Sequence, residues 1–306
     1  MATLSDIKAR IKTVANIKKI TKAMQLVAAA KLNKAQERAH TVRPYADELD
    51  GILGALAAAG DADESSDAPM EMSFSEDSPA LVTTREKLFA QNEVKKPGVV
   101  LMTSDRGLCG AFNTNLIRAG QKFLDENHDK ECKLITLGRK GHMYFSKRDV
   151  EIAYHREGID DKLNLAEIKE ITGTLVKMYV DDEVDALYLI YAKSIRAAIY
   201  HVTQQKFLSI PALDGAEGAA DENYVMEPDR DQLFATLITL YATTSIFSAL
   251  ADSFASEYGA KMAAMQLATK NADEKLSDLI IQRNRLRQAV ITKEIAEIVG
   301  GAEALQ

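Results

Sequence analysis

The sequence has 306 residues and a mass of 33.6 kDa, with 46% hydrophobic and 27% charged residues. This balance excludes a disordered chain, and the length allows two domains of ordinary size. No apolar run reaches the roughly 18–20 residues of a membrane span, and the N-terminus shows no signal-peptide core. Only Cys109 and Cys132 are present, which excludes a disulfide framework or a multi-cysteine metal site.

Charge is unevenly placed along the chain. Residues 1–43 contain ten Lys or Arg and two acids, a net charge of +8, so the remainder must carry −15 to reach the total of −7. A basic segment on an acidic chain indicates an acidic partner, either nucleic acid or the acidic surface of another protein. A solvated helix face is the alternative. We expect no nucleic-acid partner, because the rest of the chain would repel DNA.

The first sixty residues have the periodicity of a helix. Apolar or small residues fall at positions 4, 7, 11 and 14, then 17, 20, 24 and 27, and then from 28 to 56 at further steps of three and four. Two successive steps of three, from 14 to 20, predict that the stripe drifts around the helix there. The helix should begin near Ser5, and Pro44 should interrupt or bend it. We assign residues 1–59 to this helix.

Residues 60–79 differ in composition. They contain seven acids, two prolines and no Lys or Arg, which predicts a flexible, acidic surface loop that the rest of the fold does not need. We assign residues 60–97 to this loop or insertion and a linker.

Short apolar runs alternate with helical patterns between residues 98 and 210. This alternation predicts an α/β domain with a mostly parallel sheet. The expected strands are 99–102, 133–137, 150–154, 186–191 and 199–208, and the expected helices are 113–127, 139–147 and 164–181.

The last segment predicts one very long helix. After a linker at 211–228, the 71 residues from Asp229 to Val299 contain no proline and only one glycine, Gly259. At about 1.5 Å per residue such a helix is on the order of 100 Å long, so most of it must protrude and needs a partner. We expect residues 229–306 to pair with the N-terminal helix as an antiparallel coiled coil, with the last turns extending beyond Met1. The predicted fold is thus a coiled coil of the terminal helices with an inserted Rossmann-like α/β domain.

One motif lies where an α/β fold binds phosphates. Residues 104–110, Ser-Asp-Arg-Gly-Leu-Cys-Gly, follow the first predicted strand and precede a helix. The pattern is neither a dinucleotide fingerprint nor a P-loop, so a structural turn, with Gly107 at positive φ, is one interpretation. An α/β nucleotide-binding enzyme with a coiled-coil dimerisation arm is the alternative. Cys109 lacks an evident His and Asn or Asp pair, and the five histidines lack metal-ligand spacing, so we assign no catalytic, cofactor-binding or metal residue.

Several stretches resemble the γ subunit of rotary, F-type ATP synthases. The resemblance covers the chain except residues 60–95, with four motifs in the family's order. The stretches that carry it are residues 20–31, Arg43-Pro44-Tyr45, the 104–110 motif, residues 256–272 and, most specifically, residues 284–302.

The resemblance implies a non-catalytic rotor shaft without a cofactor. Its coiled coil would stand inside a hexamer of α and β subunits, and its α/β part would lie against the ε subunit and the membrane ring of c subunits. It would couple proton translocation to ATP synthesis or hydrolysis on β, at the cytoplasmic face of a bacterial inner membrane. The positions that match the family's partner contacts are Met24, Lys261, Arg287, Gln288 and Thr292.

The sequence departs from the family pattern in three places. The acidic 60–79 segment has no counterpart in the relatives considered. Lys261 stands where they usually have Arg, and Lys cannot make a bidentate contact. The redox insertion with a cysteine pair, typical of chloroplast versions, is absent, so thiol regulation is not expected.

Overall fold

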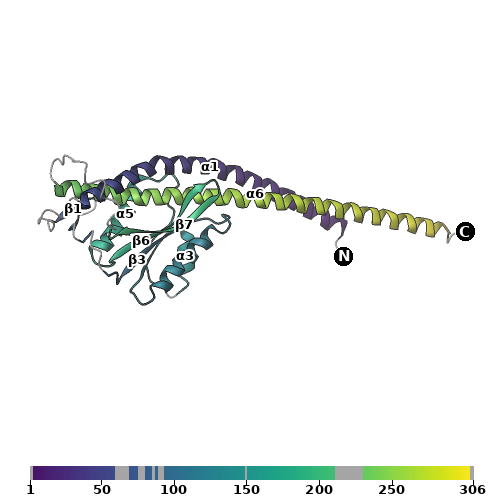
Figure 1. Cartoon of the computed structure of the whole chain (residues 1–306). Coiled ribbons are helices and arrows are strands. Elements are labelled where there is room, and N and C mark those ends of the chain that lie inside the picture. Colours follow the sequence, from purple (N-terminus) through teal and green to yellow (C-terminus); the bar gives the residue numbers. More distant parts are fainter. Residues whose placement is uncertain are drawn as a thin grey trace. The chain divides into compact units, whose positions relative to one another are not determined.

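The computed structural model describes residues 3–58, 69–74, 80–84, 87–88, 93–148, 150–210 and 230–303. The chain divides into two compact units. One, here the α/β unit, spans Ala30–Ala260. The other, here the terminal unit, joins Met1–Ala29 to Lys261–Gln306. Two long helices, α1 (Leu4–Ala58) and α6 (Arg230–Glu303), run through both units (Figure 1).

The α/β unit is built on a five-stranded sheet in the order β5-β4-β3-β6-β7. Its strands are β3 (Pro97–Met102), β4 (Lys133–Leu137), β5 (Ile152–Arg156), β6 (Ala186–Arg196) and β7 (Ile199–Leu208). Only the β6–β7 pair is antiparallel. All five strands lie where the sequence predicts them, and β6 continues further than expected, into a hairpin with β7.

Both faces of this sheet are covered, so its central strands are apolar throughout. In β3, Val99 and Leu101 point to one face, towards α3 (Phe112–Glu126) and α4 (Arg139–Phe145). Val100 and Met102 point to the other, towards α5 (Leu165–Val180) and α6. Because neighbouring side chains of a strand alternate between faces, an unbroken apolar run is typical of a strand buried on both sides.

Helix α6 supplies much of the second face. Phe234, Ile238, Ala242 and Ile246 are buried in the core cluster beneath the sheet. By length and composition alone, this helix also contains a stretch apolar enough to cross a membrane, contrary to our expectation from the sequence, and 56% of that stretch is buried. Its apolar character is thus explained by packing against the sheet.

The terminal unit is an antiparallel pair of helices, as predicted. Ile7 and Ala28 of α1, and Met265, Ala272 and Leu279 of α6, are buried. Thr269 and Thr21 share a hydrogen bond of 2.8 Å between their Oγ1 atoms, and Lys18 donates to Asp273. These two contacts fix the register, and α6 continues past the start of α1 (Figure 1).

The seam of α1 in this unit differs from the predicted one. One row of buried and half-buried positions advances by alternating steps of three and four, at Leu4, Ile7, Ile11, Val14, Lys18, Thr21, Gln25 and Ala28, and Ala15, Met24 and Ala29 are half-buried beside it. The stripe therefore does not drift after Val14, as the apolar pattern suggested. Lys18 and Thr21 face α6 because Asp273 and Thr269 provide them with polar partners. Ile17, Ile20 and Val27, which we expected in the seam, are exposed.

Two further expectations differ in part from the structure. Helix α1 runs through Pro44, so the expected interruption is not present, and the other expected effect, a bend, stays a prediction. In the predicted acidic loop, Met70–Met72 form β1, which pairs with β2 (Leu81–Thr83), and Met70, Met72 and Phe74 are buried in the core. A flexible, dispensable loop is therefore wrong for 70–74, whose apolar side chains alternate with polar ones. The rest of that prediction, at 60–68 and 75–79, and the linker at 211–228, lie outside the described residues.

Candidate functional site: the terminal helix pair

All five positions singled out from the sequence lie in the terminal unit, in two groups. Met24 is half-buried, three residues beyond Thr21, which pairs with Thr269. That register places Met24 level with about residue 266, so Lys261, also half-buried, lies roughly 7 Å further along the pair. These two residues are therefore close in level and belong to different helices.

The second group lies far along α6. Arg287, Gln288 and Thr292 are exposed, and the Thr292 hydroxyl donates to the Gln288 carbonyl oxygen across 2.9 Å. Arg287 is separated from Lys261 by about 39 Å of helix at 1.5 Å per residue. The structure thus does not bring the five residues into one site. They mark two levels of one elongated surface.

An outward apolar stripe on α1 is the feature that sequence reasoning missed. Ile17, Ile20 and Val27 are 46%, 59% and 58% exposed. With Met24 they follow steps of three, four and three, so all four lie on one face. The signal was present in the sequence, but we assigned these residues to the seam. Met24, which is half-buried, therefore lies among exposed apolar side chains of α1.

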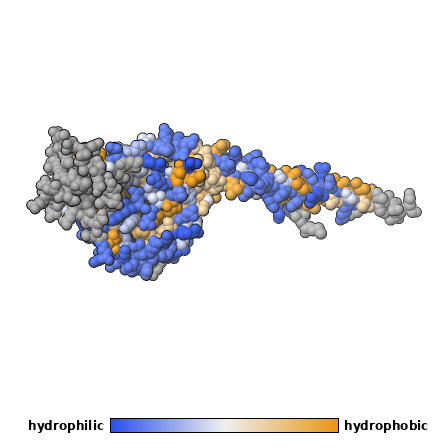
Figure 2. Space-filling model, viewed as in Figure 1, coloured by the Kyte–Doolittle hydropathy of each residue, from blue (hydrophilic) through white to orange (hydrophobic). Residues whose placement is uncertain are grey.

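Helix α6 has exposed apolar residues as well. Leu267 and Ile281 are about half-exposed and lie two heptads apart. Beyond the start of α1, the last turns of α6 expose Val290, Ile291, Ile295 and Ile298. Figure 2 shows apolar side chains among the charged ones along this unit. Exposed apolar patches of this kind are typical of surfaces that a partner covers.

The terminal unit is also basic. Its two segments, 1–29 and 261–306, contain 13 Lys or Arg and 7 Asp or Glu, a net charge of +6. The remaining residues must then carry −13 to reach the total of −7. The arrangement suits a partner whose surface combines acidic and apolar groups.

The 104–110 motif is a structural turn. Asp105 accepts backbone hydrogen bonds from Arg139, at the start of α4, and from Gly158, at 2.8 and 2.9 Å. Asn113 and Ser104 are linked by side-chain hydrogen bonds. Leu108 and Gly110 have positive φ, of 66° and 60°, whereas Gly107 does not. Positive φ at Gly107, the condition under which Gly107→Val would damage folding, is therefore not met.

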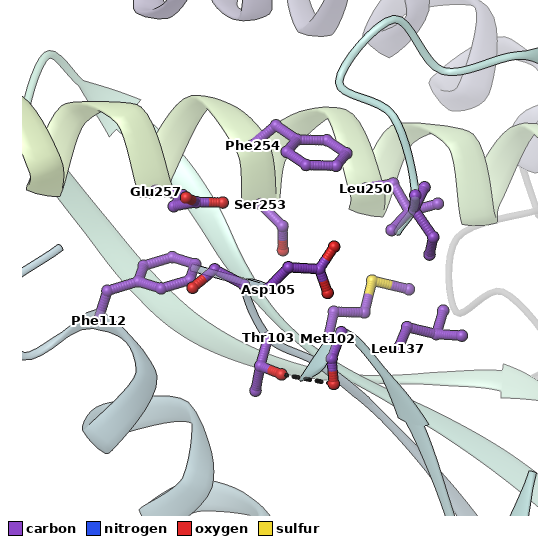
Figure 3. A pocket seen from close by; sticks show the side chains of 12 residues that line it. Met102, Thr103, Asp105, Phe112, Leu137, Leu250, Ser253, Phe254 and Glu257 are labelled. Carbon is purple, nitrogen blue, oxygen red and sulfur yellow. Dashed lines mark hydrogen bonds between the residues drawn. The ribbon is translucent and has the colours of Figure 1, made fainter. Parts of the chain in front are cut away.

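The same turn borders a cavity where a Rossmann fold would hold a nucleotide. Its volume is about 30 Å³, room for little more than one or two waters. Figure 3 shows why: Leu250, Ser253, Phe254 and Glu257 of α6 lie across it, opposite Asp105. A nucleotide does not fit while α6 lies there, so the alternative of a nucleotide-binding enzyme loses its structural basis.

The next features are the possible metal-ligating groups and the two cysteines. Among the described residues, no group of three or more His, Cys, Asp or Glu is arranged to hold a metal ion. Cys109 is buried and lies 3.2 Å from Asn113 Nδ2. Burial raises the pKa of the Cys132 thiol, which makes it a poor nucleophile.

Known proteins resemble this chain over its whole length. The family model described as ATP synthase matches residues 3–305. ATP synthase gamma chains from Desulfitobacterium hafniense, Anaeromyxobacter sp. and Prosthecochloris aestuarii are 38%, 39% and 40% identical over 307, 308 and 312 residues. In each case the alignment covers 100% of this chain and 99–100% of the relative.

Solved structures share the fold. A chain of the Tetrahymena thermophila mitochondrial ATP synthase central stalk and c-ring aligns with a TM-score of 0.61 and 24% identity, over 81% of this chain and 99% of that one. A chain of the Euglena gracilis mitochondrial ATP synthase aligns with a TM-score of 0.63 and 16% identity, over 99% and 94%.

The fold defines a class of protein in which an α/β domain is inserted, along the sequence, between two long helices whose terminal parts pair with each other. The chain belongs to the ATP synthase gamma chain family. It is a gamma subunit of ATP synthase, a non-catalytic subunit of that enzyme complex.

Proposed function

We propose that the terminal helix pair is the surface through which this rotor engages the catalytic α and β subunits. The observation that carries the proposal is the outward stripe of Ile17, Ile20, Met24 and Val27, in a unit with a net charge of +6. Large apolar side chains on a narrow helix pair gain about 25 cal/mol per Å² when a partner covers them. The basic excess selects a partner with acidic groups.

Rotation requires contacts that form and break repeatedly. Apolar burial is non-directional, so a shaft can turn within an apolar sleeve without losing specific bonds. Exposed polar groups, such as Arg287 and Gln288, supply contacts that engage at particular angles and release at others. Under this proposal the apolar residues, Met24 among them, support the shaft. Arg287, Gln288 and Thr292 transmit force to it at one level, and Lys261 does so at the level of Met24.

The remaining partners follow from the same assignment. The α/β unit would contact the ε subunit and the c-ring. The complex would lie at the cytoplasmic face of a bacterial inner membrane, consistent with the bacterial relatives. Torque from proton flow would then pass from the ring through the α/β unit to the helix pair.

The test is proton-driven ATP synthesis in membrane vesicles, normalised to the amount of assembled β subunit. We expect Arg287→Ala and Gln288→Leu to lower synthesis per complex more than they lower assembly. Met24→Lys should also reduce coupling, since it adds a charge to the apolar stripe. Lys147→Ala, at an exposed position in the α/β unit, is the matched control and should leave the rate unchanged. Wild-type rates per complex in all three test variants would refute the assignment of these residues.

A further inference from the structure

A cluster of polar side chains joins both long helices to the α/β domain. Asp161 lies in the loop between β5 and α5, and its Oδ2 accepts hydrogen bonds from Tyr258 of α6 at 2.5 Å and from Lys31 of α1 at 2.7 Å. The Lys31 ammonium also lies 3.2 Å from the Tyr258 hydroxyl and 5.2 Å from its ring centroid. Arg38 donates to the backbone carbonyl of Asp161. We call Lys31, Asp161 and Tyr258 the helix clamp.

The clamp is a charged contact in a mostly buried place. The Asp161 side chain is 20% exposed, and Tyr258 is 8% exposed. Burial alone would raise the pKa of Asp161, but hydrogen bonds from Lys31 and Tyr258 outweigh it and lower the pKa to about 2. Burial, then the Asp161 carboxylate, raise the pKa of Tyr258, so its hydroxyl remains a donor. At neutral pH the Asp161 carboxylate is therefore charged and accepts two hydrogen bonds.

The two helical residues of the clamp lie near the ends of the α/β unit in the sequence. Lys31 and Tyr258 are within two residues of Ala30 and Ala260, the ends of the α/β unit. The clamp therefore holds α1 and α6 close to the two ends of the α/β unit.

A second attachment lies close to the clamp in the sequence of α6. Gly259 approaches Ala198 in the β6–β7 hairpin so closely that a Cβ would lie 2.8 Å from the Ala198 nitrogen. Further along, Arg43 donates to Asp252 at 2.7 Å and to the Ser194 carbonyl oxygen at 3.3 Å. The β5–α5 loop and the β6–β7 hairpin thus each contact both α1 and α6 within the α/β unit.

We propose that Asp161 is a positioning residue for torque, which fixes α1 at Lys31 and α6 at Tyr258 against twisting within the α/β unit. The inference rests on the proposed rotor function. Hydrogen bonds weaken steeply with misalignment, so the two short contacts to one carboxylate, one from each helix, resist rotation of α1 and of α6. The apolar packing beneath α6 is non-directional and resists such rotation less. Loss of the carboxylate should make the joint more compliant without dismantling the core.

The test measures that compliance in the assembled complex. The stator is immobilised, and a probe is attached to the α/β domain through Lys147→Cys, in a Cys132→Ser background. The readout is the angular variance of the probe during pauses in ATP-driven rotation. Asp161→Asn should increase the variance, and Tyr258→Phe, which removes one of the donors, should increase it less. Glu126→Gln, which breaks the exposed Lys122–Glu126 pair of α3, is the control and should match wild type.

Different results of this experiment would refute the rotor function and the role of the helix clamp. If the wild-type complex hydrolyses ATP while the probe does not rotate, the rotor function itself is refuted. If the probe rotates but Asp161→Asn and Tyr258→Phe both show wild-type variance, the clamp is refuted. Should Asp161→Asn fail to assemble, Tyr258→Phe, which retains the ion pair with Lys31, decides the question.

Discussion

The hydroxyl groups of Thr269 and Thr21 lie 2.8 Å apart across the two terminal helices. With the Lys18–Asp273 contact one turn away, this pair sets a register in which the positions of opposed residues add to about 290. Polar groups at a coiled-coil seam are known to select one register at a cost in stability. Here they also turn the apolar stripe of α1 outward.

The register predicts a specific crosslink. Thr21→Cys with Thr269→Cys should join α1 to α6 within one chain when treated with a short bifunctional thiol reagent. Ile20→Cys with Leu267→Cys, at exposed positions, is the control and should crosslink poorly. Peptide mapping of the monomer band measures both. An efficient control crosslink with an absent test crosslink would show that the register is wrong.

Seam and stripe residues should differ in their effect on stability. Ile7 is 4% exposed, so Ile7→Ala should lower the free energy of unfolding of the isolated chain by about 2–5 kcal/mol. Ile20 is 59% exposed, so Ile20→Ala should change that free energy by less than about 0.5 kcal/mol. Denaturant titration followed by circular dichroism compares them. Equal losses would place Ile20 in the seam after all.

Two helical glycines form a matched pair. At Gly259 a Cβ would meet the Ala198 backbone at 2.8 Å, whereas at Gly51 it would meet nothing within 4 Å. Gly259→Ala should therefore destabilise the chain, although alanine is the better helix former. Gly51→Ala should stabilise it by up to about 1 kcal/mol. Thermal unfolding measures both, and a stabilised Gly259→Ala variant would contradict the close hairpin contact.

The helix clamp should appear in acid unfolding. The pKa of Asp161 is about 2 in the folded chain, below the ordinary value of 3.8. A lowered carboxyl pKa means that its stabilisation is present above pH 4 and is lost as the pH falls from about 4 to 2. The difference in free energy of unfolding between wild type and Asp161→Asn should shrink over that range. A difference independent of pH would show that the carboxylate charge does not contribute.

Much of the fold was predictable because its signals are local. The 71 residues without proline indicate α6, and the apolar runs at β3, β4 and β6 indicate strands buried on both faces. The seam shift was not predictable from α1 alone. Placing Lys18 and Thr21 inside is favourable only because Asp273 and Thr269 meet them, and that pairing depends on the register. The short strand β1 was hidden by the acids around Met70 and Met72.

The candidate site was predictable only in part. Arg287, Gln288 and Thr292 were found through the family resemblance, because nothing in their spacing distinguishes them from other exposed polar residues. The outward stripe was misassigned for the reason just given. Asp161 gave no sequence signal, because its partners Lys31 and Tyr258 lie 130 and 97 residues away along the chain.

Thiol labelling of Ile20→Cys, in a Cys132→Ser background, tests the central claim most directly. Cys109 is buried and should not interfere. In the isolated chain, the new thiol should react rapidly with a maleimide, as should Lys147→Cys on the α/β unit. In the assembled complex, position 20 should be protected because the catalytic subunits cover the stripe, while position 147 should stay reactive. Equal labelling of position 20 in the isolated chain and in the complex would contradict the account.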